Sequence, residues 1–420
     1  MKVCVIGNGG REHALAWRLS ISPSVTKVYA IPGSAAMSDC AELVGIDWQQ
    51  SDHLISFLKD NQVDLVVVGP EAPLVAGLAD TLNKAGIPVF GPSKAAAQLE
   101  GSKVFAKDLM KKYNIPTAAY GVFHKVDEAK EFISQTGAPI VVKADGLAAG
   151  KGVVVAMTIE EANAAVEDML SGNRFGEAGS TVVIEEFMEG EEASLLAFVD
   201  GKTVVPMIAS QDHKRIFDGD KGPNTGGMGT YAPAPVLTDA LRDEAMKTIL
   251  EPMVAAMEKE GMPYVGCLYA GLMITPQGPK VVEFNARFGD PETQVVLPLL
   301  DSDLGQIMMA CATGTLTADM VKWKDSSAAC VILASKGYPE TSSKGDVIHG
   351  DIKQHDTTIV FHSGTKLIGD EYVTNGGRVL GVVGLGKDLR TALDRAYERI
   401  EHIDFEGMQY RTDIGAKAFK

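Results

Sequence analysis

Residues 281–292, VVEFNARFGDPE, combine a strand-like alternation with polar side chains that are typical of a binding site. Side chains on a β-strand alternate between two faces, so Val282 and Phe284 are expected on one face and Glu283, Asn285 and Arg287 on the other. Glu283 and Asn285 offer the oxygen ligands that Mg²⁺ prefers beside water and phosphates. The planar guanidinium of Arg287 can hold a carboxylate or a phosphate. We predict a metal site here; the alternative is a surface strand with a solvated polar face.

The composition of the chain is that of a folded protein with an acidic surface. It has 420 residues, 45% of them hydrophobic, and a formal net charge of -16, which argues against general affinity for nucleic acid or anionic membranes. Its five cysteines show no C-x-x-C spacing, so a zinc or disulfide framework is not expected. The first residues run straight into a predicted strand, and no apolar run reaches the ~18 residues of a membrane span. We therefore expect a cytoplasmic protein without a signal peptide.

The first 90 residues alternate between strand and helix patterns. Apolar runs at residues 3–6, 25–31, 63–68 and 88–90 are separated by helical segments, a pattern that indicates a doubly wound parallel sheet. Ligands of such sheets bind beyond the carboxyl ends of the strands.

Residues 7–12, GNGGRE, invite a dinucleotide-binding interpretation, which we reject. Glu12 replaces the third glycine, and the second strand ends without an acid for a ribose hydroxyl. A sugar monophosphate fits better: the amides of Gly9 and Gly10 with the Arg11 side chain would bind its phosphate, and Glu12 and Glu71 its hydroxyls or an amine. The alternative is a purely structural glycine turn.

A glycine loop at residues 144–152 lies between predicted strands at 138–143 and 153–156. It is not a P-loop, because Lys151 is followed by glycine and no helix follows directly. Such a hairpin can fold over phosphates as a lid, with Lys143 beneath it. Backbone groups at the end of the strand at 182–188 can bind an adenine edge. One of Glu191 or Glu192 can bind the ribose hydroxyls.

Further along, residues 210–215, SQDHKR, precede the glycine-dense loop 221–230, which is expected to be mobile or shaped by a ligand. A hairpin formed by residues 265–274 and 281–288 places the acidic strand in a second sheet. The segment after residue 328 contains short strands and turns, for which structural packing is the default interpretation.

Together these motifs resemble the ATP-grasp arrangement: two phosphate-facing lysines, a lid hairpin, an adenine strand and a Glu-x-Asn metal strand. Residues 7–13, 69–74, 143–152, 211–215, 222–229 and 283–294 together resemble the phosphoribosylamine–glycine ligase family, also called glycinamide ribonucleotide synthetases. The resemblance covers nearly the whole chain. One departure lies at residues 32–36, PGSAA, where the family usually reads Pro-Gly-Asn-x-Gly, so no substrate role is carried onto Ser34 or Ala36.

The resemblance implies an N-terminal α/β substrate domain (1–101), an ATP-grasp domain (102–325) with a lid subdomain at about 117–188, and a small β-rich C-terminal domain (326–420). It implies ATP-dependent ligation of glycine to 5-phosphoribosylamine through glycyl phosphate in purine biosynthesis, with Mg²⁺ or Mn²⁺, and by a monomer.

The resemblance also assigns roles to residues. Catalytic roles fall on Lys143, Asp212 and Arg287, of which Asp212 would bind the amine of glycine and Arg287 its carboxylate. The nucleotide would be bound by Lys103, Lys143, Gly150, Gly152, Glu185, Glu186, Phe187, Met188, Glu191 and Glu192. The two substrates would be bound by Gly9, Gly10, Arg11, Glu12, Glu71, Asp212, Lys214, Gly226, Gly227, Arg287 and Asp290.

Three rival functions remain at this stage. The nearest is another ATP-dependent carboxylate–amine ligase or carboxylase with the same grasp domain. The second is a dinucleotide oxidoreductase, and the third is a non-catalytic nucleotide sensor. Substrate-dependent release of ADP decides between the first rival and glycine ligation, and cofactor binding without ATP hydrolysis would support the second. The joint presence of metal ligands, two lysines and a lid argues against the third.

Overall fold

The computed structural model describes residues 1–147, 152–171 and 176–420. The N-terminal part is a five-stranded parallel sheet in the order β3-β2-β1-β4-β5. Its strands are β1 (Lys2–Gly7), β2 (Lys27–Pro32), β3 (Glu42–Leu43), β4 (Leu65–Val68) and β5 (Val89–Phe90). Its helices are α1 (Gly10–Ser20), α2 (Ser51–Asp60), α3 (Glu71–Ala76) and α4 (Leu78–Lys84). The predicted parallel sheet is confirmed; α3, directly after Pro70, was not predicted.

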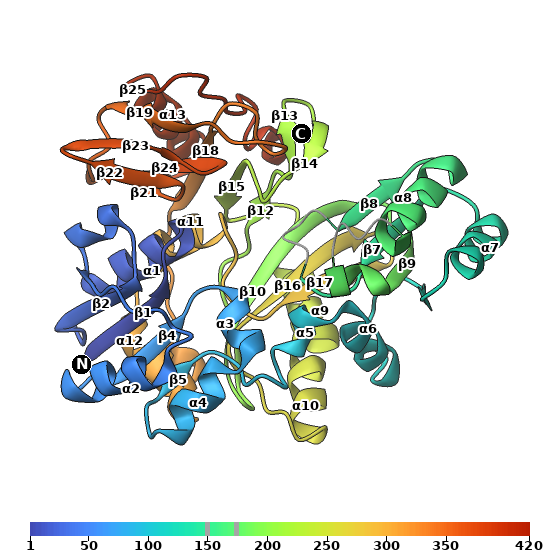
Figure 1. The fold of residues 1–420 in the computed structure, drawn as a ribbon, viewed down its shortest axis with the longest axis horizontal. Helices are drawn as coiled ribbons and strands as arrows, with labels where there is room; N and C mark the ends of the chain where they lie inside the picture. Colours follow the sequence, from blue (N-terminus) through green and yellow to red (C-terminus); the bar gives the residue numbers. More distant parts are fainter. Residues whose placement is uncertain (148–151, 172–175) are drawn as a thin grey trace.

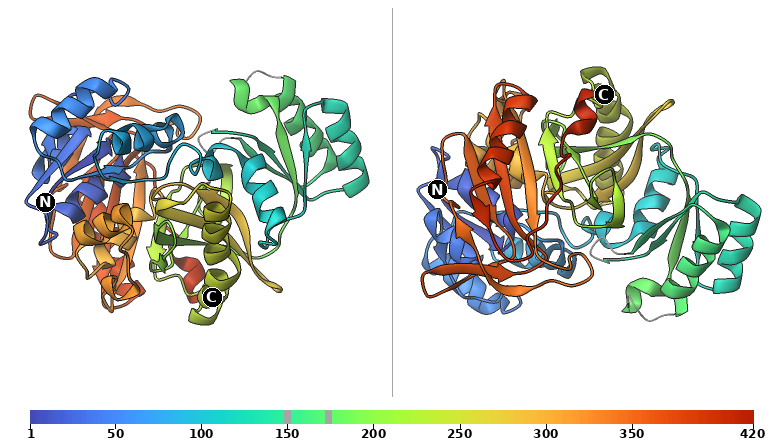
Figure 2. Two further views of the ribbon diagram at one scale, coloured as in Figure 1. Left: turned by 90° about the horizontal axis from the view of Figure 1, so that it is seen from below. Right: turned by 90° about the horizontal axis from the view of Figure 1, so that it is seen from above.

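The central part contains two separate four-stranded sheets. The sheet of the lid subdomain has the order β6-β9-β7-β8. It consists of β6 (Tyr120–Phe123), β7 (Ile140–Ala144), β8 (Val153–Ala156) and β9 (Val182–Glu186), and it carries α7 (Val126–Thr136) and α8 (Ile159–Ser171). In both views of Figure 2 this subdomain, coloured teal and green, stands apart from the rest of the molecule. A linker that contains α5 (Gln98–Gly101) and α6 (Lys103–Lys112) connects the N-terminal sheet to the lid subdomain.

The second central sheet is antiparallel, in the order β11-β10-β16-β17. It consists of β10 (Glu191–Asp200), β11 (Val204–Pro206), β16 (Val265–Thr275) and β17 (Gly278–Asn285). A long helical segment packs on this sheet but is interrupted: α9 (Asp239–Ala245) and α10 (Glu251–Lys259) flank a π-helical turn at Met246–Leu250. Pro252 explains the interruption, because proline has no N–H for the bond that an α-helix requires at that position.

Strand β17 departs from the simple alternation that its sequence predicts. Leu272 of β16 pairs with Val281, whereas the adjacent Gly271 pairs with Glu283, so Val282 is the extra residue of a β-bulge. Val281 and Phe284 are therefore both in the core, whereas Val282 is half-buried, belongs to no apolar cluster of the described residues and lines the pocket. The prediction that Val282 shares a face with Phe284 was wrong, although Glu283 and Asn285 do share the other face. The strand ends at Asn285, so Arg287 lies just beyond it.

The C-terminal sheet incorporates strands from the middle of the chain. Its order is β12-β15-β18-β24-β21, with strands β12 (Gln211–Asp212), β15 (Gly229–Ala232), β18 (Ser327–Ala334), β21 (Thr358–His362) and β24 (Arg378–Gly386). Helix α13 (Leu389–Ile400) packs against β18 and β24, and a three-stranded sheet of β19 (Lys344–Val347), β22 (Thr365–Ile368) and β23 (Glu371–Asn375) adjoins it. Strands β20 (His349–Gly350) and β25 (Ile403–Asp404) form a further pair.

The N-terminal, central and C-terminal parts share one apolar cluster. It joins Val3 and Leu15 to Phe198 of β10, Ile307 of α12 (Leu304–Thr313) and Ile332 of β18, each at most 1% exposed. Figure 1 shows the N-terminal sheet (blue) and the C-terminal strands (orange and red) stacked together, while α7 and α8 lie at the far side of the molecule. The described residues of the lid subdomain are absent from this cluster and form an apolar cluster of their own. None of the helices among the described residues has the length and apolar character needed to span a membrane.

Residues 411–417, which we call the C-terminal clasp, bind the hairpin formed by β13 (Arg215–Phe217) and β14 (Lys221–Asn224). The Arg411 guanidinium is 1% exposed and pairs with Asp220 at 2.9 Å and with Asp413 at 2.7 Å. Asp413 in turn accepts the amide of Gly219 at 2.9 Å, and Lys417 pairs with Asp220 at 2.8 Å. A buried guanidinium with two carboxylate partners holds its surroundings in one arrangement. The clasp therefore fixes the position of a hairpin whose residues line the main pocket.

Candidate active site

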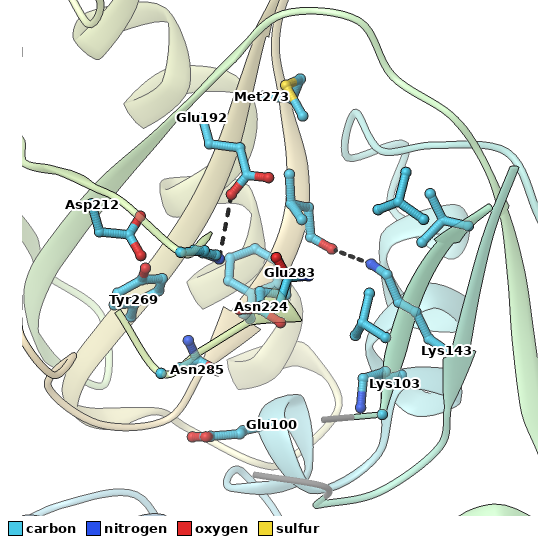
Figure 3. A pocket seen from close by; sticks show the side chains of 18 of the residues that line it. Glu100, Lys103, Lys143, Glu192, Asp212, Asn224, Tyr269, Met273, Glu283 and Asn285 are labelled. Atoms are coloured by element: carbon cyan, nitrogen blue, oxygen red, sulfur yellow. Dashed lines mark hydrogen bonds and ion pairs between the residues drawn. The ribbon is translucent and has the colours of Figure 1, made fainter. Parts of the chain in front are cut away.

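A pocket of about 870 Å³ lies between the two central sheets and reaches the N-terminal and C-terminal parts. Figure 3 shows Lys103 and Lys143 on one side of it and Glu283, Asn285 and Asp212 on the other. Of the predicted site residues that the structure describes, most line this pocket. The exceptions are Gly9, Gly10, Glu12 and Gly227, which are not among its lining residues.

Glu283 and Asn285 present their side chains to the pocket from β17. Among the described residues, Glu283 makes no ion pair and the Asn285 amide makes no hydrogen bond, so both are available to a ligand. Burial opposes ionisation of Glu283, but Lys214, Lys143 and Lys103 together outweigh it and lower its pKa. A half-buried carboxylate that is ionised, beside an uncommitted amide oxygen, fits a hard divalent cation. No group of three His, Cys, Asp or Glu side chains in the described ranges could hold a metal unaided, so phosphate oxygens and water would complete the shell.

Lys143 faces the pocket from β7 and is held by two acceptors. Its ammonium group is 3.1 Å from the Glu185 carboxylate and donates to the carbonyl of Val282 at 3.1 Å. The other oxygen of Glu185 pairs with Lys107 at 3.1 Å. The predicted nucleotide ligand Glu185 is thus 2% exposed and bound to two lysines.

Lys107 is a residue that the sequence interpretation missed, since a lysine on a helix is usually exposed to solvent. It is 2% exposed, and burial together with the charge of Lys143 lowers its pKa to about 8 against the opposing effect of Glu185. Lys103, four residues earlier on α6, does face the pocket as predicted. Its ammonium donates to the carbonyl of Gly146 at 2.9 Å, and burial is the main cause that lowers its pKa. The spacing of four places both lysines on one face of the helix.

The strand predicted at residues 182–188 is two residues shorter in the structure. Strand β9 stops at Glu186, and Phe187 and Met188 continue along the pocket wall. Among the described residues their amides have no backbone hydrogen-bond partner, so they are available to a ligand. Gly152 lines the pocket, whereas Gly150 lies outside the described residues together with the rest of segment 148–151 of the predicted lid loop.

The two candidate ribose ligands have different partners. Glu191 accepts a bond from the side chain of Gln211 at 3.2 Å, while Glu192 pairs with Lys214 at 3.3 Å. Glu192 is the main cause that raises the pKa of Lys214. Asp212, two residues from Lys214, has its pKa raised to about 7, mainly by burial and also by the carboxylates of Glu292 and Glu192.

Arg287 joins two carboxylates of the N-terminal part and its linker. It pairs with Glu71 at 3.2 Å and with Glu100 at 2.7 Å, and Glu100 also accepts the amide of Ala286 at 2.8 Å. Burial disfavours the charged guanidinium, but the two glutamates outweigh it and raise its pKa. Glu100 was not predicted as a site residue. Its partners lie 186 and 187 positions away, so the sequence carries no local signal of its role.

The start of helix α1 is occupied by carboxylates. Glu12 accepts the amide of Gly9 at 2.8 Å and pairs with Arg11 at 2.6 Å, and Asp290 accepts the amide of Arg11 at 3.3 Å. Glu12 is 2% exposed and lies so close to Gly7 and Gly69 that a Cβ on either would clash with it. The glycines thus make room for a capping carboxylate. These contacts compete with the predicted phosphate at this helix end.

Arg378 of the C-terminal part is another contributor that the sequence interpretation missed. Its guanidinium donates to the carbonyls of Gly226 and Asp290, both at 2.9 Å, and lies 3.5 Å from the Asp290 carboxylate. A Cβ on Gly227 would lie 2.6 Å from Pro291, so glycine is required for this close approach. Arg378 therefore holds the glycine loop at Gly226, a predicted substrate ligand, next to Asp290, which follows strand β17. The C-terminal part contributes to the site and is more than structural packing.

Comparison with protein families gives matches along nearly the whole chain. Three models of phosphoribosylglycinamide synthetase match: its N domain at residues 1–100, its ATP-grasp (A) domain at residues 101–293 and its C domain at residues 328–417. The chain is 53% identical over 418 residues to a protein of Halalkalibacterium halodurans named phosphoribosylamine–glycine ligase, covering 100% of this chain and 97% of that protein.

Solved structures give the same result. The crystal structure of phosphoribosylamine–glycine ligase from Thermotoga maritima superposes with a TM-score of 0.86 at 34% identity, covering 99% of this chain and 100% of that one. A second match is the biotin carboxylase domain of a 2-oxoglutarate carboxylase from Hydrogenobacter thermophilus, solved with magnesium and ADP. Its TM-score is 0.75 at 17% identity, covering 97% of this chain and 91% of that one. The second likeness shows the shared fold alone.

Proposed function

The chain belongs to the phosphoribosylglycinamide synthetase family, and from this we propose that its central pocket joins glycine to 5-phosphoribosylamine at the expense of ATP. The observation that carries the assignment of the site is the arrangement across the pocket. Lys103 and Lys143 lie on one side, and the ionised Glu283 with Asn285 on the other. The enzyme is a ligase of purine biosynthesis that uses ATP and acts on small molecules.

The reaction proceeds in two transfers. A carboxylate oxygen of glycine takes the γ-phosphoryl group of ATP, which releases ADP and gives glycyl phosphate. The amine of 5-phosphoribosylamine then attacks the activated carbonyl, phosphate leaves, and one amine proton is lost, giving glycinamide ribonucleotide. No side-chain nucleophile is needed, so the residues of the pocket act by positioning and by stabilising charge.

Glu283 and Asn285 would hold a divalent cation, for which we propose Mg²⁺, with Mn²⁺ as an alternative. When bound, it would neutralise the charge that develops on the transferring phosphoryl group. Lys103 and Lys143 supply positive charge from the opposite wall, where burial strengthens their effect. Phe187 and Met188 offer backbone groups to the adenine, and Glu191 or Glu192 a carboxylate to the ribose.

For glycine, we propose that Asp212 binds the amine and that Arg287 binds the carboxylate. Arg287 already holds Glu71 and Glu100, so glycine would share a guanidinium whose orientation is fixed. We propose Arg11, Glu71, Gly226 and Asp290 as the surroundings of 5-phosphoribosylamine, with Gly9, Gly10, Glu12, Lys214 and Gly227 nearby. We further expect a monomer that acts in the cytoplasm.

Release of ADP tests the proposed function directly. Purified protein is assayed with ATP and Mg²⁺ while glycine and 5-phosphoribosylamine are each omitted in turn. We expect full ADP release only with both substrates, and none with bicarbonate or with a larger amino acid in place of glycine. ADP release that bicarbonate supports as well as glycine would instead indicate a carboxylase.

We expect the affinity for glycine to depend on the ionisation of Asp212. Burial raises the pKa of this carboxyl to about 7, so it is mostly protonated below that pH and ionised above it. A carboxylate binds the glycine ammonium better than a neutral acid does. The kcat/KM for glycine should therefore rise about tenfold per pH unit below pH 7 and level off above it.

Steady-state kinetics from pH 5.5 to 8.5 check this expectation, with Asp212→Asn as the comparison. The variant should have a lower kcat/KM for glycine and a flat profile through pH 7. An unchanged inflection in the variant would assign the titration to another group.

A further inference from the structure

We propose that Lys107, which the reaction scheme does not use, is a positioning residue that keeps the charge of Lys143 available to the nucleotide phosphates. The proposal rests on the proposed function, because it concerns nucleotide binding in the same pocket. It depends on three buried side chains from three elements: Lys107 of α6, Lys143 of β7 and Glu185 of β9.

The hydrogen bonds of the two lysines differ in number. The Lys107 ammonium has three acceptors, Glu185 at 3.1 Å, the Thr117 hydroxyl at 2.7 Å and the Ala118 carbonyl at 3.4 Å. An ammonium group has three N–H donors, so all of those on Lys107 are used within the protein. Lys143 has only two acceptors among the described residues, Glu185 and the Val282 carbonyl. One N–H of Lys143 is left for a ligand in the pocket.

The charges lead to the same conclusion. Glu185 carries one negative charge and lies between two ammonium groups, so the three side chains together carry one positive charge. Without Lys107, the Glu185 carboxylate would pair with Lys143 alone, and the net charge of these two side chains would be zero. Because these groups are at most 5% exposed, water screens their interaction little.

The same contacts tie the lid subdomain to the metal strand. Thr117, which binds Lys107, donates to the carbonyl of Val281 at 2.7 Å, and the Val281 amide donates to the carbonyl of Pro116 at 2.8 Å. Lys143 binds the carbonyl of the next residue, Val282. Thr117 and Lys143 thus bind the carbonyls of Val281 and Val282, the two residues that precede Glu283. Lys107 therefore sets the position of Lys143 relative to β17.

Binding of a ligand series tests the proposal without relying on turnover. The dissociation constants of ATP and of adenosine are measured by calorimetry, without divalent metal, for the wild type and for Lys107→Met. We expect the ratio of ATP affinity to adenosine affinity to fall about tenfold, the size expected for the loss of one charge in a partly buried site. Lys111→Met is the matched control, since Lys111 is one turn further along α6 and exposed. It should leave the ratio unchanged.

A second variant separates charge from packing. In Lys107→Met combined with Glu185→Gln, no carboxylate remains to neutralise Lys143, so the affinity ratio should return toward the wild-type value. An equal loss for ATP and adenosine in Lys107→Met, an unchanged ratio, or a further fall in the double variant would each overturn the proposal. Failure of the proposed function would show differently, as ADP release that does not depend on glycine.

Discussion

Glu283→Gln is expected to lower kcat by roughly 10²-fold or more, because a charged metal ligand contributes several kcal/mol of transition-state stabilisation. Glutamine has nearly the same shape and keeps one oxygen, so the strand and its core neighbours Val281 and Phe284 should remain in place. The loss should therefore appear in catalysis, with a folding stability close to that of the wild type. Steady-state ADP release over a range of Mg²⁺ concentrations measures it.

Two comparisons make the result specific. Without divalent metal, Glu283→Gln should bind ATP as well as the wild type or better, since a negative charge near the phosphates has been removed. Glu251→Gln on α10 is the control, because Glu251 is exposed and lies on the helix that covers the same sheet. Turnover near the wild-type rate in Glu283→Gln would remove the basis for a metal on β17.

Arg287→Met is expected to reduce both catalysis and stability. The substitution leaves Glu71 and Glu100 close together without their shared cation, and removing one partner of a buried ion pair costs about 3–5 kcal/mol. The kcat/KM for glycine should fall roughly 10²-fold as well, since the proposed carboxylate ligand is lost. Chemical denaturation and initial-rate kinetics measure the two effects separately.

The loss of stability should grow with pH. Burial, the largest cause, already raises the pKa of Glu100 even with Arg287 present. Without Arg287 the folded protein holds protons on these carboxyls that the unfolded chain releases above its ordinary pKa of about 4.3. Stability therefore falls as the pH rises, so the difference from the wild type should be larger at pH 8 than at pH 5.

Arg242→Met is the matched control for this variant. Arg242 also contacts two carboxylates, Asp239 and Asp243, each at 3.0 Å, but on the exposed face of α9. Surface pairs of this kind contribute about 0–1 kcal/mol. A loss in Arg287→Met no larger than that of the control, or independent of pH, would contradict the interpretation of Arg287 as a buried junction.

The sequence predicted those features of the site that depend on local patterns. Glu283 and Asn285 follow from strand alternation, and Lys143 from its place before a glycine loop; all three line the pocket. The bulge at Val282 was not predictable, because it depends on how β17 pairs with β16, and an extra residue in one strand leaves no mark in the alternation.

Lys107, Glu100 and Arg378 were missed for a related reason. Each owes its role to partners that folding brings close, such as Arg378 with Asp290, which are 88 positions apart. Lys107 had a weak signal, its spacing of four residues from Lys103, but lysines on a helix are more often solvated. Similarly, Glu12 was interpreted as a substrate ligand in place of a third glycine, whereas in the structure Gly7 and Gly69 provide the space in which it caps α1.

The C-terminal clasp has a consequence for synthesis of the protein on the ribosome. Thr412 and Asp413 bind Asp218 and Gly219 across 194 positions, so the hairpin that lines the pocket is made long before the residues that grip it. During translation this hairpin lacks its contacts with the clasp until residues 411–417 have emerged from the ribosome. The nascent chain can therefore acquire its N-terminal sheet early, but it completes the wall of its pocket only after residues 411–417 have been synthesised.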